Sequence, residues 1–390
     1  MRIADRIGAT MPPPVMEARR WLAETALPEG MALLNLSQAA PVAPPPEGLR
    51  RAIAEAALSE DGAHLYGPVL GLPMLRERLA AEISALYGGQ VAAAEVAITA
   101  GCNQAFCATL ATLADAGDEV ILPVPWYFNH KMWLDMAGVR AVPLATGPGL
   151  LPDPEAAAAL IGPRTRAIVL VTPNNPGGVE YPPALIAEFA ALARAHGIAL
   201  ILDETYRDFL AASDAPHGLF AEPDWAEVLI HLYSFSKAYR LTGHRVGAIA
   251  AHPTRLAEVE KFLDTVSICP NQLGQRAALW GMGNLRQWLA GERAEILARR
   301  TAVEAGFAAL PGWEVLGAGA YFAYVRHPFE MASDALARRL LARAGLLVLP
   351  GTMFAPEGDA AAAGALRIAF ANADRAGIAT LFERLAGFRP

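Results

Sequence analysis

The amino-acid sequence predicts an α/β protein with a large domain, built on a mostly parallel central sheet covered by helices, and a smaller α+β domain. Short apolar runs alternate with helical stretches between residues 96 and 250, which is typical of parallel strands joined by crossover helices. Several of these runs lack polar alternation, as expected for strands covered on both faces. After about residue 285 the alternation becomes less regular, which indicates the second domain.

The composition fits a chain that buries a large core. Of the 390 residues, 54% are hydrophobic and 18% are charged, which excludes a disordered protein. The net charge of −7 and the lack of Lys/Arg-rich runs argue against a nucleic-acid partner. No apolar run is long enough to span a membrane, and Cys102, Cys107 and Cys269 form neither a disulfide framework nor a zinc quartet. We therefore expect a cytoplasmic protein with no metal site and no membrane partner.

Residues 1–47 form an arm rich in proline, with Pro12 to Pro14 and Pro44 to Pro46 as its densest runs. Proline lacks the N–H that a helix or an inner strand needs. The sequence therefore predicts an extended arm, and we expect it to pack on the smaller domain.

Residues 48–285 are assigned to the large domain. Helices are predicted at 50–58 and at 72–87, the second ended by Gly88-Gly89, and the stretch 183–196 has the length of a crossover helix. The predicted strands are residues 96–99, 119–122, 139–144, 167–171, 198–202, 228–233 and 246–250.

Residues 286–390 are assigned to the smaller domain. It begins with a long helix at 286–310, which Pro311-Gly312 end. Strands at 321–326, 346–349 and 365–370 and a last helix to about residue 387 follow.

Polar segments follow four of the predicted strands, at the sheet edge where open α/β proteins bind ligands. They are ITAGCNQAF (98–106), VTPNNPGG (171–178), DETY (203–206) and SFSKAYRLTGHRVG (234–247). Each segment alone also fits an ordinary turn, cap or surface loop. Together they supply a helix start and an arginine for a phosphate, an asparagine, a carboxylate and a lysine. Pyridoxal phosphate needs this set of groups.

With these segments in this order, the chain resembles the class I/II aminotransferases of the fold-type-I pyridoxal phosphate superfamily, the aspartate aminotransferase-like enzymes. The resemblance runs from about residue 35 to residue 367 and beyond, and its most specific match is S-x-S-K-x-x-x-x-x-G-x-R-x-G at 234–247. It implies pyridoxal 5'-phosphate as cofactor, an L-amino acid and a 2-oxo acid as substrates, and a homodimer.

The resemblance also implies roles for residues near the ring of the cofactor. Lys237 is similar to the lysine that forms a Schiff base with it, and Asp203 to the carboxylate that keeps the pyridine nitrogen protonated. Tyr206 and Asn175 resemble the pair that hydrogen-bonds the phenolic oxygen. His130 resembles a histidine that supports Asp203, but an ordinary buried histidine fits the sequence nearly as well.

Further cofactor contacts are implied in the same way. The phosphate would be bound by Gly101, Cys102, Asn103, Ser234 and Arg245. Tyr66 resembles the tyrosine that reaches the phosphate of a neighbouring subunit. Tyr127, with Trp126 as the second choice, resembles the aromatic residue that stacks on the ring.

The substrate contacts carry one departure from the family. Arg367 resembles the arginine that clamps the α-carboxylate of the substrate, with Asn175 beside it. Ala39-Ala40 stands where the family usually has a glycine, and we assign the substrate contact to Ala40. We find no counterpart of the second arginine with which some aspartate-type enzymes bind a side-chain carboxylate.

The predicted function is therefore that of an aminotransferase, a transferase of nitrogenous groups, with a ping-pong mechanism through a Lys237 Schiff base. A β-elimination C–S lyase with the same residues stays open as an alternative, and release of pyruvate and ammonia without a 2-oxo acid acceptor would identify it. A non-catalytic, cofactor-binding regulatory protein is less favoured, because the arm is short and not basic.

Overall fold

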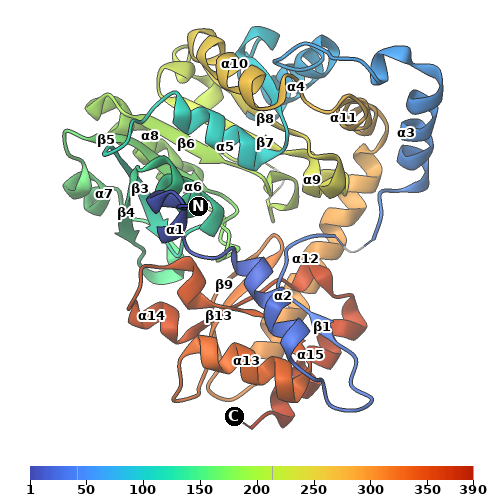
Figure 1. Cartoon of the computed structure of the whole chain (residues 1–390), viewed down its shortest axis with the longest axis vertical. Helices are drawn as coiled ribbons and strands as arrows, with labels where there is room; N and C mark the ends of the chain where they lie inside the picture. Colours follow the sequence, from blue (N-terminus) through green and yellow to red (C-terminus); the bar gives the residue numbers. More distant parts are fainter. Residues whose placement is uncertain (42, 213, 390) are drawn as a thin grey trace.

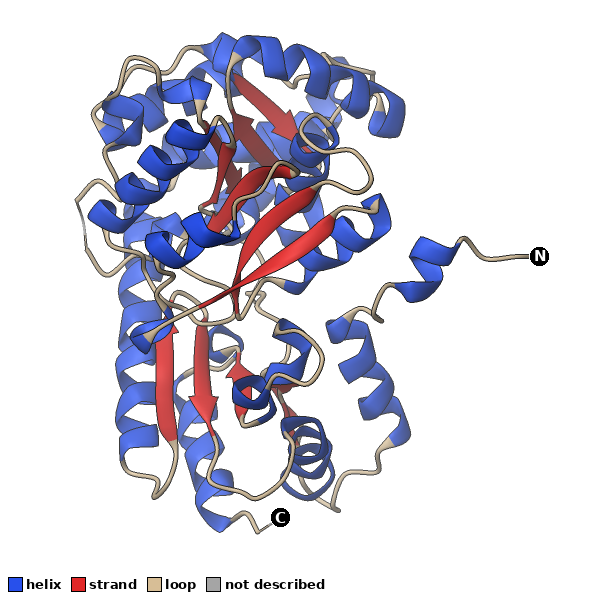
Figure 2. Ribbon diagram, turned by 90° about the vertical axis from the view of Figure 1, so that its left-hand side faces the viewer, coloured by secondary structure: helices blue, strands red, loops and turns tan. Residues whose placement is uncertain are grey.

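The computed structural model describes residues 1–41, 43–212 and 214–389. Its strands form two main groups, one above the other in Figure 2. The larger group is a seven-stranded sheet with the order β2-β8-β7-β6-β5-β3-β4. Its strands are β2 (Val96–Thr99), β3 (Glu119–Val124), β4 (Arg140–Ala145), β5 (Thr165–Val171), β6 (Ala199–Asp203), β7 (Leu229–Ser234) and β8 (Gly247–Ala250).

Among the described strands of this sheet, only β8 runs antiparallel to its neighbours. The predicted α/β class with a mostly parallel sheet is confirmed. Because the other strands share one direction, the segments that follow β2, β3, β5, β6 and β7 all leave the sheet at the same edge.

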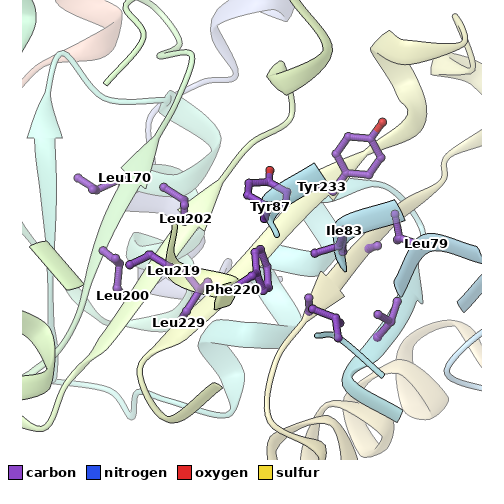
Figure 3. Packing of buried hydrophobic residues seen from close by; sticks show 14 of the residues in the cluster. Leu79, Ile83, Tyr87, Leu170, Leu200, Leu202, Leu219, Phe220, Leu229 and Tyr233 are labelled. Carbon is purple, nitrogen blue, oxygen red and sulfur yellow. The ribbon is translucent and has the colours of Figure 1, made fainter. Parts of the chain in front are cut away.

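Helices cover both faces of the large sheet, as Figure 1 shows. Successive residues of β6 belong to different apolar clusters: Leu200 and Leu202 lie in one, and Ile201 lies in the other. The first cluster, part of which Figure 3 shows, includes side chains of α3 (Glu47–Ser59), α4 (Pro73–Tyr87), α7 (Pro154–Leu160), α8 (Pro183–His196) and α11 (Gln272–Asn284). The second includes side chains of α5 (Cys102–Ala111), α6 (Phe128–Ala137) and α10 (Pro253–Ser267).

The second main sheet is antiparallel, with the order β12-β13-β10-β9. It consists of β9 (Glu314–Gly319), β10 (Phe322–Arg326), β12 (Leu349–Pro350) and β13 (Ala365–Ile368). Around it lie α12 (Arg286–Ala308), α13 (Ser333–Ala344), α14 (Ala360–Ala363) and α15 (Arg375–Gly387). The sequence analysis missed β9, because its EVLGAG contains two glycines and has little β propensity.

The N-terminal arm differs from the expected extended chain, because it contains α1 (Asp5–Ala9) and α2 (Pro14–Glu24). Proline is compatible with the first turn of a helix, where the N–H has no intrahelical partner, so Pro14 starts α2 instead of preventing it. Ala18 and Trp21 of α2 are buried in a cluster with Phe307 and Phe370 of the C-terminal part. The arm then adds β1 (Leu34–Asn35), parallel to β11 (Leu346–Leu347).

The domain boundaries after residues 47 and 285 stay a prediction. None of the helices within the described ranges is both long and apolar enough to cross a bilayer.

Candidate active site

A cavity of about 400 Å³ lies at the carboxyl edge of the large sheet and reaches β13 and the N-terminal arm. The predicted site residues that line it are Cys102, Asn103, Tyr127, Asn175, Asp203, Tyr206, Ser234, Lys237, Arg245 and Arg367. A larger cavity of about 780 Å³ between η3 (Pro148–Leu150) and β9 contains none of the predicted residues. The fold therefore brings strand-end segments far apart in the sequence into one place.

Lys237 lies on α9 (Phe235–Ala238), the single helical turn that follows β7. Ser234 caps this turn, and its hydroxyl accepts a hydrogen bond from the N–H of Ser236 at 3.2 Å. The Lys237 amine donates to the carbonyl of Ala39, and no carboxylate of the described chain pairs with it. Burial lowers the pKa of Lys237 to about 7, with further lowering by the charges of Arg245 and Arg367. Such an amine is partly unprotonated at neutral pH, so it can act as a nucleophile or accept a proton.

Asp203 is the last residue of β6, and its side chain is buried. One carboxylate oxygen lies 3.3 Å from Nε2 of His130, and the other accepts hydrogen bonds from the backbone N–H and the hydroxyl of Thr205. Burial favours the neutral acid, but His130 and Thr205 outweigh it and hold the pKa of Asp203 below its usual value. His130 itself stacks on Phe106 with ring centroids 3.9 Å apart. The site therefore contains a permanent negative charge with a fixed orientation.

Tyr127 lies over the cavity, whereas Trp126 is buried in an apolar cluster. The Tyr127 hydroxyl donates to Asn103 at 3.3 Å and accepts from Asn129 at 2.9 Å. Burial raises the pKa of Tyr127 to about 12, so its hydroxyl stays protonated and the side chain stays neutral. Tyr206 lines another part of the wall, and burial raises its pKa well above the usual value.

Arg245 lies between η7 (Thr242–His244) and β8, and its guanidinium reaches the start of α5, where backbone N–H groups and the helix dipole are positive. Gly101 precedes this helix at φ +84°, and a Cβ there would lie 2.1 Å from Nη2 of Arg245. Nη1 of Arg245 donates to the Ser236 hydroxyl at 3.3 Å and to the Thr242 carbonyl at 3.1 Å, but it has no ion pair within the residues that the structure describes. A cation beside a helix N-terminus is unfavourable unless an anion joins them, so this cradle fits a phosphate.

Arg367 lies in the middle of β13 and is only 2% exposed. It donates to Asn175 at 3.2 Å and to the carbonyl of Ser37, while its Nε has no partner in the described ranges. Burial lowers the pKa of Arg367 to about 10, and no carboxylate within these ranges neutralises it. A buried guanidinium with free donors fits a carboxylate ligand that binds in two-pronged fashion.

Apart from Trp126, four predicted residues do not line the cavity: Ala40, Tyr66, Gly101 and His130. The backbone N–H of Ala40 turns toward Asn372, to which it donates at 3.2 Å, and the cavity contact falls to Ala39 instead. Tyr66 is 81% exposed on the surface of this chain. Gly101 and His130 lie directly behind the wall, next to Arg245 and Asp203.

The sequence analysis missed several residues of the cavity. Thr205 and Ser236 lie inside the recognised motifs, so their hydroxyls could have been included from the sequence. Arg19 and Gln38 come from the arm, and only the fold brings them to the cavity. In the described part of the chain, no group of three or more His, Cys, Asp or Glu side chains is arranged to hold a metal ion.

Comparisons with known proteins agree with this geometry. A family model described as aminotransferase class I and II matches residues 32–385. A valine–pyruvate aminotransferase of Mycobacterium tuberculosis is 32% identical over 95% of this chain and 94% of its own. An arginine–pyruvate transaminase of Pseudomonas aeruginosa is 32% identical over 87% and 86%. The structure of Thermus thermophilus aspartate aminotransferase with maleate superposes with a TM-score of 0.89 at 29% identity, over 99% of this chain and 100% of that one.

Proposed function

The chain belongs to the aminotransferase class I and II family and is an aminotransferase, and we propose that it moves an amino group from an L-amino acid to a 2-oxo acid with pyridoxal 5'-phosphate in the cavity. The observation that carries this proposal is the pairing, in one cavity, of an amine with a pKa of about 7 at Lys237 and a fixed carboxylate at Asp203.

The residues of the cavity fit this cofactor. We assign the phosphate to the cradle of Arg245, Ser234 and the helix start at 101–103, because this cradle combines a free cation with N–H donors. The ring would lie against Tyr127, and its nitrogen would meet Asp203. The assigned contacts of the phenolic oxygen are Tyr206 and Asn175. When bound, the cofactor supplies an aldehyde that takes up amino groups and a ring that accepts electrons.

The protein's own residues would perform the proton transfers. The amine of Lys237 would take a proton from the α-carbon of the substrate and deliver it to the former aldehyde carbon of the cofactor. A pKa near the working pH suits a group that both accepts and donates a proton. Asp203 keeps a negative charge that would stabilise a proton on the ring nitrogen of the cofactor. Each of the two half-reactions uses the same lysine and the same cavity, so the first product leaves before the second substrate binds, which is a ping-pong sequence.

Arg367 would bind the α-carboxylate and so orient the α-carbon. The names of the relatives include an aspartate enzyme and two pyruvate-dependent enzymes, so both dicarboxylic and monocarboxylic substrates are represented among them. The family match favours transfer over the alternative β-elimination.

A panel of amino donors with 2-oxoglutarate and with pyruvate tests the proposal. We expect product formation that depends on the acceptor and parallel lines in double-reciprocal plots, as a ping-pong mechanism requires. Pyruvate and ammonia released from cysteine-type donors without an acceptor would contradict it and favour the lyase.

We further propose a cytoplasmic homodimer in which Tyr66 reaches the partner's phosphate. Tyr66 is one of several exposed large apolar residues, and its neighbour Gly67 donates to the sulfur of Cys269 at 3.4 Å, which brings this turn next to exposed Ile268. An exposed apolar surface of this kind is typical of subunit contacts. Sedimentation equilibrium should give twice the chain mass, and a monomer would contradict the proposal.

A further inference from the structure

The larger cavity, of about 780 Å³, lies between the two main sheets. One wall consists of the ends of β3 and β4 and the turn at η3, and the other consists of β9, β10 and α14. On the left of Figure 1, β4 lies above this region and α14 below it. Among the described residues, the larger cavity shares no lining residue with the active-site cavity. Its volume lies within the range of small-molecule sites in proteins.

The wall of the larger cavity is mostly apolar. Among the described residues that line it, only five carry a polar side chain: Thr146, Glu314, Tyr324, Arg326 and Asp359. Thr146 donates to a backbone carbonyl at 2.7 Å. Arg326 donates to Glu314, and the two form a half-exposed ion pair. These three side chains are already engaged within the chain, which leaves Tyr324 and Asp359.

Tyr324 is only 3% exposed, yet its hydroxyl takes part in no hydrogen bond with the residues that the structure describes. The hydroxyl lies next to α14, because a Cβ at Gly351 would be 2.6 Å from it and 2.4 Å from the carbonyl oxygen of Ala362. Asp359 caps α14, and its carboxylate accepts from the N–H of Ala362 at 2.8 Å. The hydroxyl and the carboxylate thus lie beside the same residue of the cavity wall.

The carboxylate of Asp359 gives this part of the wall a negative charge that the chain does not compensate. Asp359 forms no ion pair in the described part of the chain, and the arginine that lines the cavity is bound to Glu314. Burial raises the pKa of Tyr324, and the charge of Asp359 raises it further, so the hydroxyl stays protonated. A ligand that covers these two groups has to supply a positive charge, or the carboxylate is buried without a partner.

We propose that the larger cavity is a ligand site for a small molecule with an apolar body and a protonated amine. The ammonium group would donate to Asp359 and to the hydroxyl of Tyr324, and the apolar body would contact the proline, alanine and leucine side chains of the opposite wall. An anion would be repelled by Asp359. The inference goes beyond the proposed function, and no step of the amino transfer depends on it.

This site adjoins the active site without overlapping it. Tyr324 of β10 faces Arg367 of β13 in the register of the two strands, and residues paired in this way have their side chains on one face, with Cβ atoms about 5 Å apart. On the other wall, Pro125 lines the larger cavity, and Tyr127, two residues later, lines the active-site cavity. An amine and a substrate can therefore be bound at the same time.

Calorimetric titration of the holoenzyme with N,N-dimethylphenethylamine tests the site. This probe has an aromatic body and a positive charge, and as a tertiary amine it cannot condense with the aldehyde of the cofactor. We expect saturable binding that butyrate, whose carboxylate we assign to Arg367, does not displace. The uncharged 2-phenylethanol should bind about tenfold more weakly, the factor of one charge-assisted hydrogen bond.

Two conservative variants locate the binding. Asp359→Asn removes the charge but keeps the cap of α14, since Asn caps helices as well as Asp does. The amine should then bind about tenfold more weakly and lose its advantage over the alcohol. Tyr324→Phe keeps the ring and should weaken amine binding about threefold. Glu357→Gln is the matched control, because Glu357 is an exposed residue of the same loop and does not line the cavity.

Three outcomes would overturn the inference. The first is that the amine shows no saturable binding. The second is displacement of the amine by butyrate, which would place it in the active-site cavity. The third is an effect of Glu357→Gln as large as that of Asp359→Asn. Circular dichroism checks the fold of each variant, and kcat/KM without amine should stay within about twofold of wild type, since neither Asp359 nor Tyr324 lines the active-site cavity.

Discussion

Two adjacent acids, Asp203 and Glu204, lie on opposite faces of the large sheet and show two ways to bury a carboxylate. Glu204 is 1% exposed and accepts hydrogen bonds from His231, at 2.8 Å, and from Tyr87, with His217 3.5 Å away. Burial opposes the charge on Glu204, but the two histidines outweigh it and hold the pKa well below the usual range. Glu204 does not line the cavity. Asp203 is also buried and has partners of its own, but it lines the cavity and can meet a ligand there.

The cations of the two regions differ in the same way. On the closed side, Arg207 has a carboxylate partner, Glu82, at 3.5 Å. Around the cavity, Lys237, Arg245 and Arg367 have none within the described ranges. Burial of charge alone therefore does not identify a functional site; cations that the chain leaves without a carboxylate partner at a cavity do.

The comparison predicts its largest effect at Asp203. We expect Asp203→Asn to lower kcat/KM by about 10²–10⁴-fold, because a neutral amide cannot hold a proton on the facing ring nitrogen. The loss would be measured in steady-state assays with saturating cofactor. The cofactor-free protein should also lose part of its free energy of unfolding, since Asn keeps the hydrogen bonds of Thr205 but loses the charge that faces His130. Activity within tenfold of wild type would contradict the role of Asp203.

Glu204 should give the reverse result. Glu204→Gln removes the charge that faces His217 and His231, so we expect the free energy of unfolding at pH 7 to fall by about 1–3 kcal/mol, measured by urea denaturation. The folded variant should keep its activity within about threefold. Because the pKa of Glu204 is lowered in the folded state, the stabilisation is present above the unfolded pKa of about 4.3 and is lost as pH falls further. A variant that is fully stable at pH 7 but inactive would reverse our assignment of the two faces.

The sequence was informative where chemistry and structure are local. The parallel strands follow from uninterrupted apolar runs, and Lys237, Asp203 and Arg245 follow from short motifs at strand ends. The sequence was uninformative where the relevant contact is distant. Arg19 lines the cavity from α2, whose Trp21 is buried in a cluster with Phe307, more than 280 residues away in the chain. Helix α2 itself was missed, since proline was read as an obstacle although it is favourable at a helix start.

The closed network of Glu204 was hidden for a related reason. Its partners Tyr87, His217 and His231 come from three separate segments, and nothing in their spacing indicates a common location. The alternation of a strand explains afterwards why the two acids of DETY separate. Asp203 ends β6, and Glu204 continues the pairing, since its N–H donates to the carbonyl of Leu232 at 2.9 Å, so the two side chains point to opposite faces. A motif thus identifies which residues are present, but the alternation of side chains along the strand determines which of them faces the cavity.

The smallest predicted effect is a gain in stability at Lys237. Between a folded pKa of about 7 and an unfolded value of about 10.4, the unfolded chain binds a proton that the folded chain lacks, so wild-type stability rises with pH across this range. Below pH 7 the amine is protonated in both states, and its burial then destabilises the folded protein most. Lys237→Met removes that cost, and we expect the cofactor-free variant to be about 1–2 kcal/mol more stable than wild type at pH 7, with a smaller gap at pH 9.

Urea denaturation at both pH values measures the gap, and Glu204→Gln is the control, since its carboxylate titrates far below this window and its effect has the opposite sign. A gap that does not change with pH would mean that the amine is not strained by burial, and the contrast between the two faces would then rest on Asp203 alone.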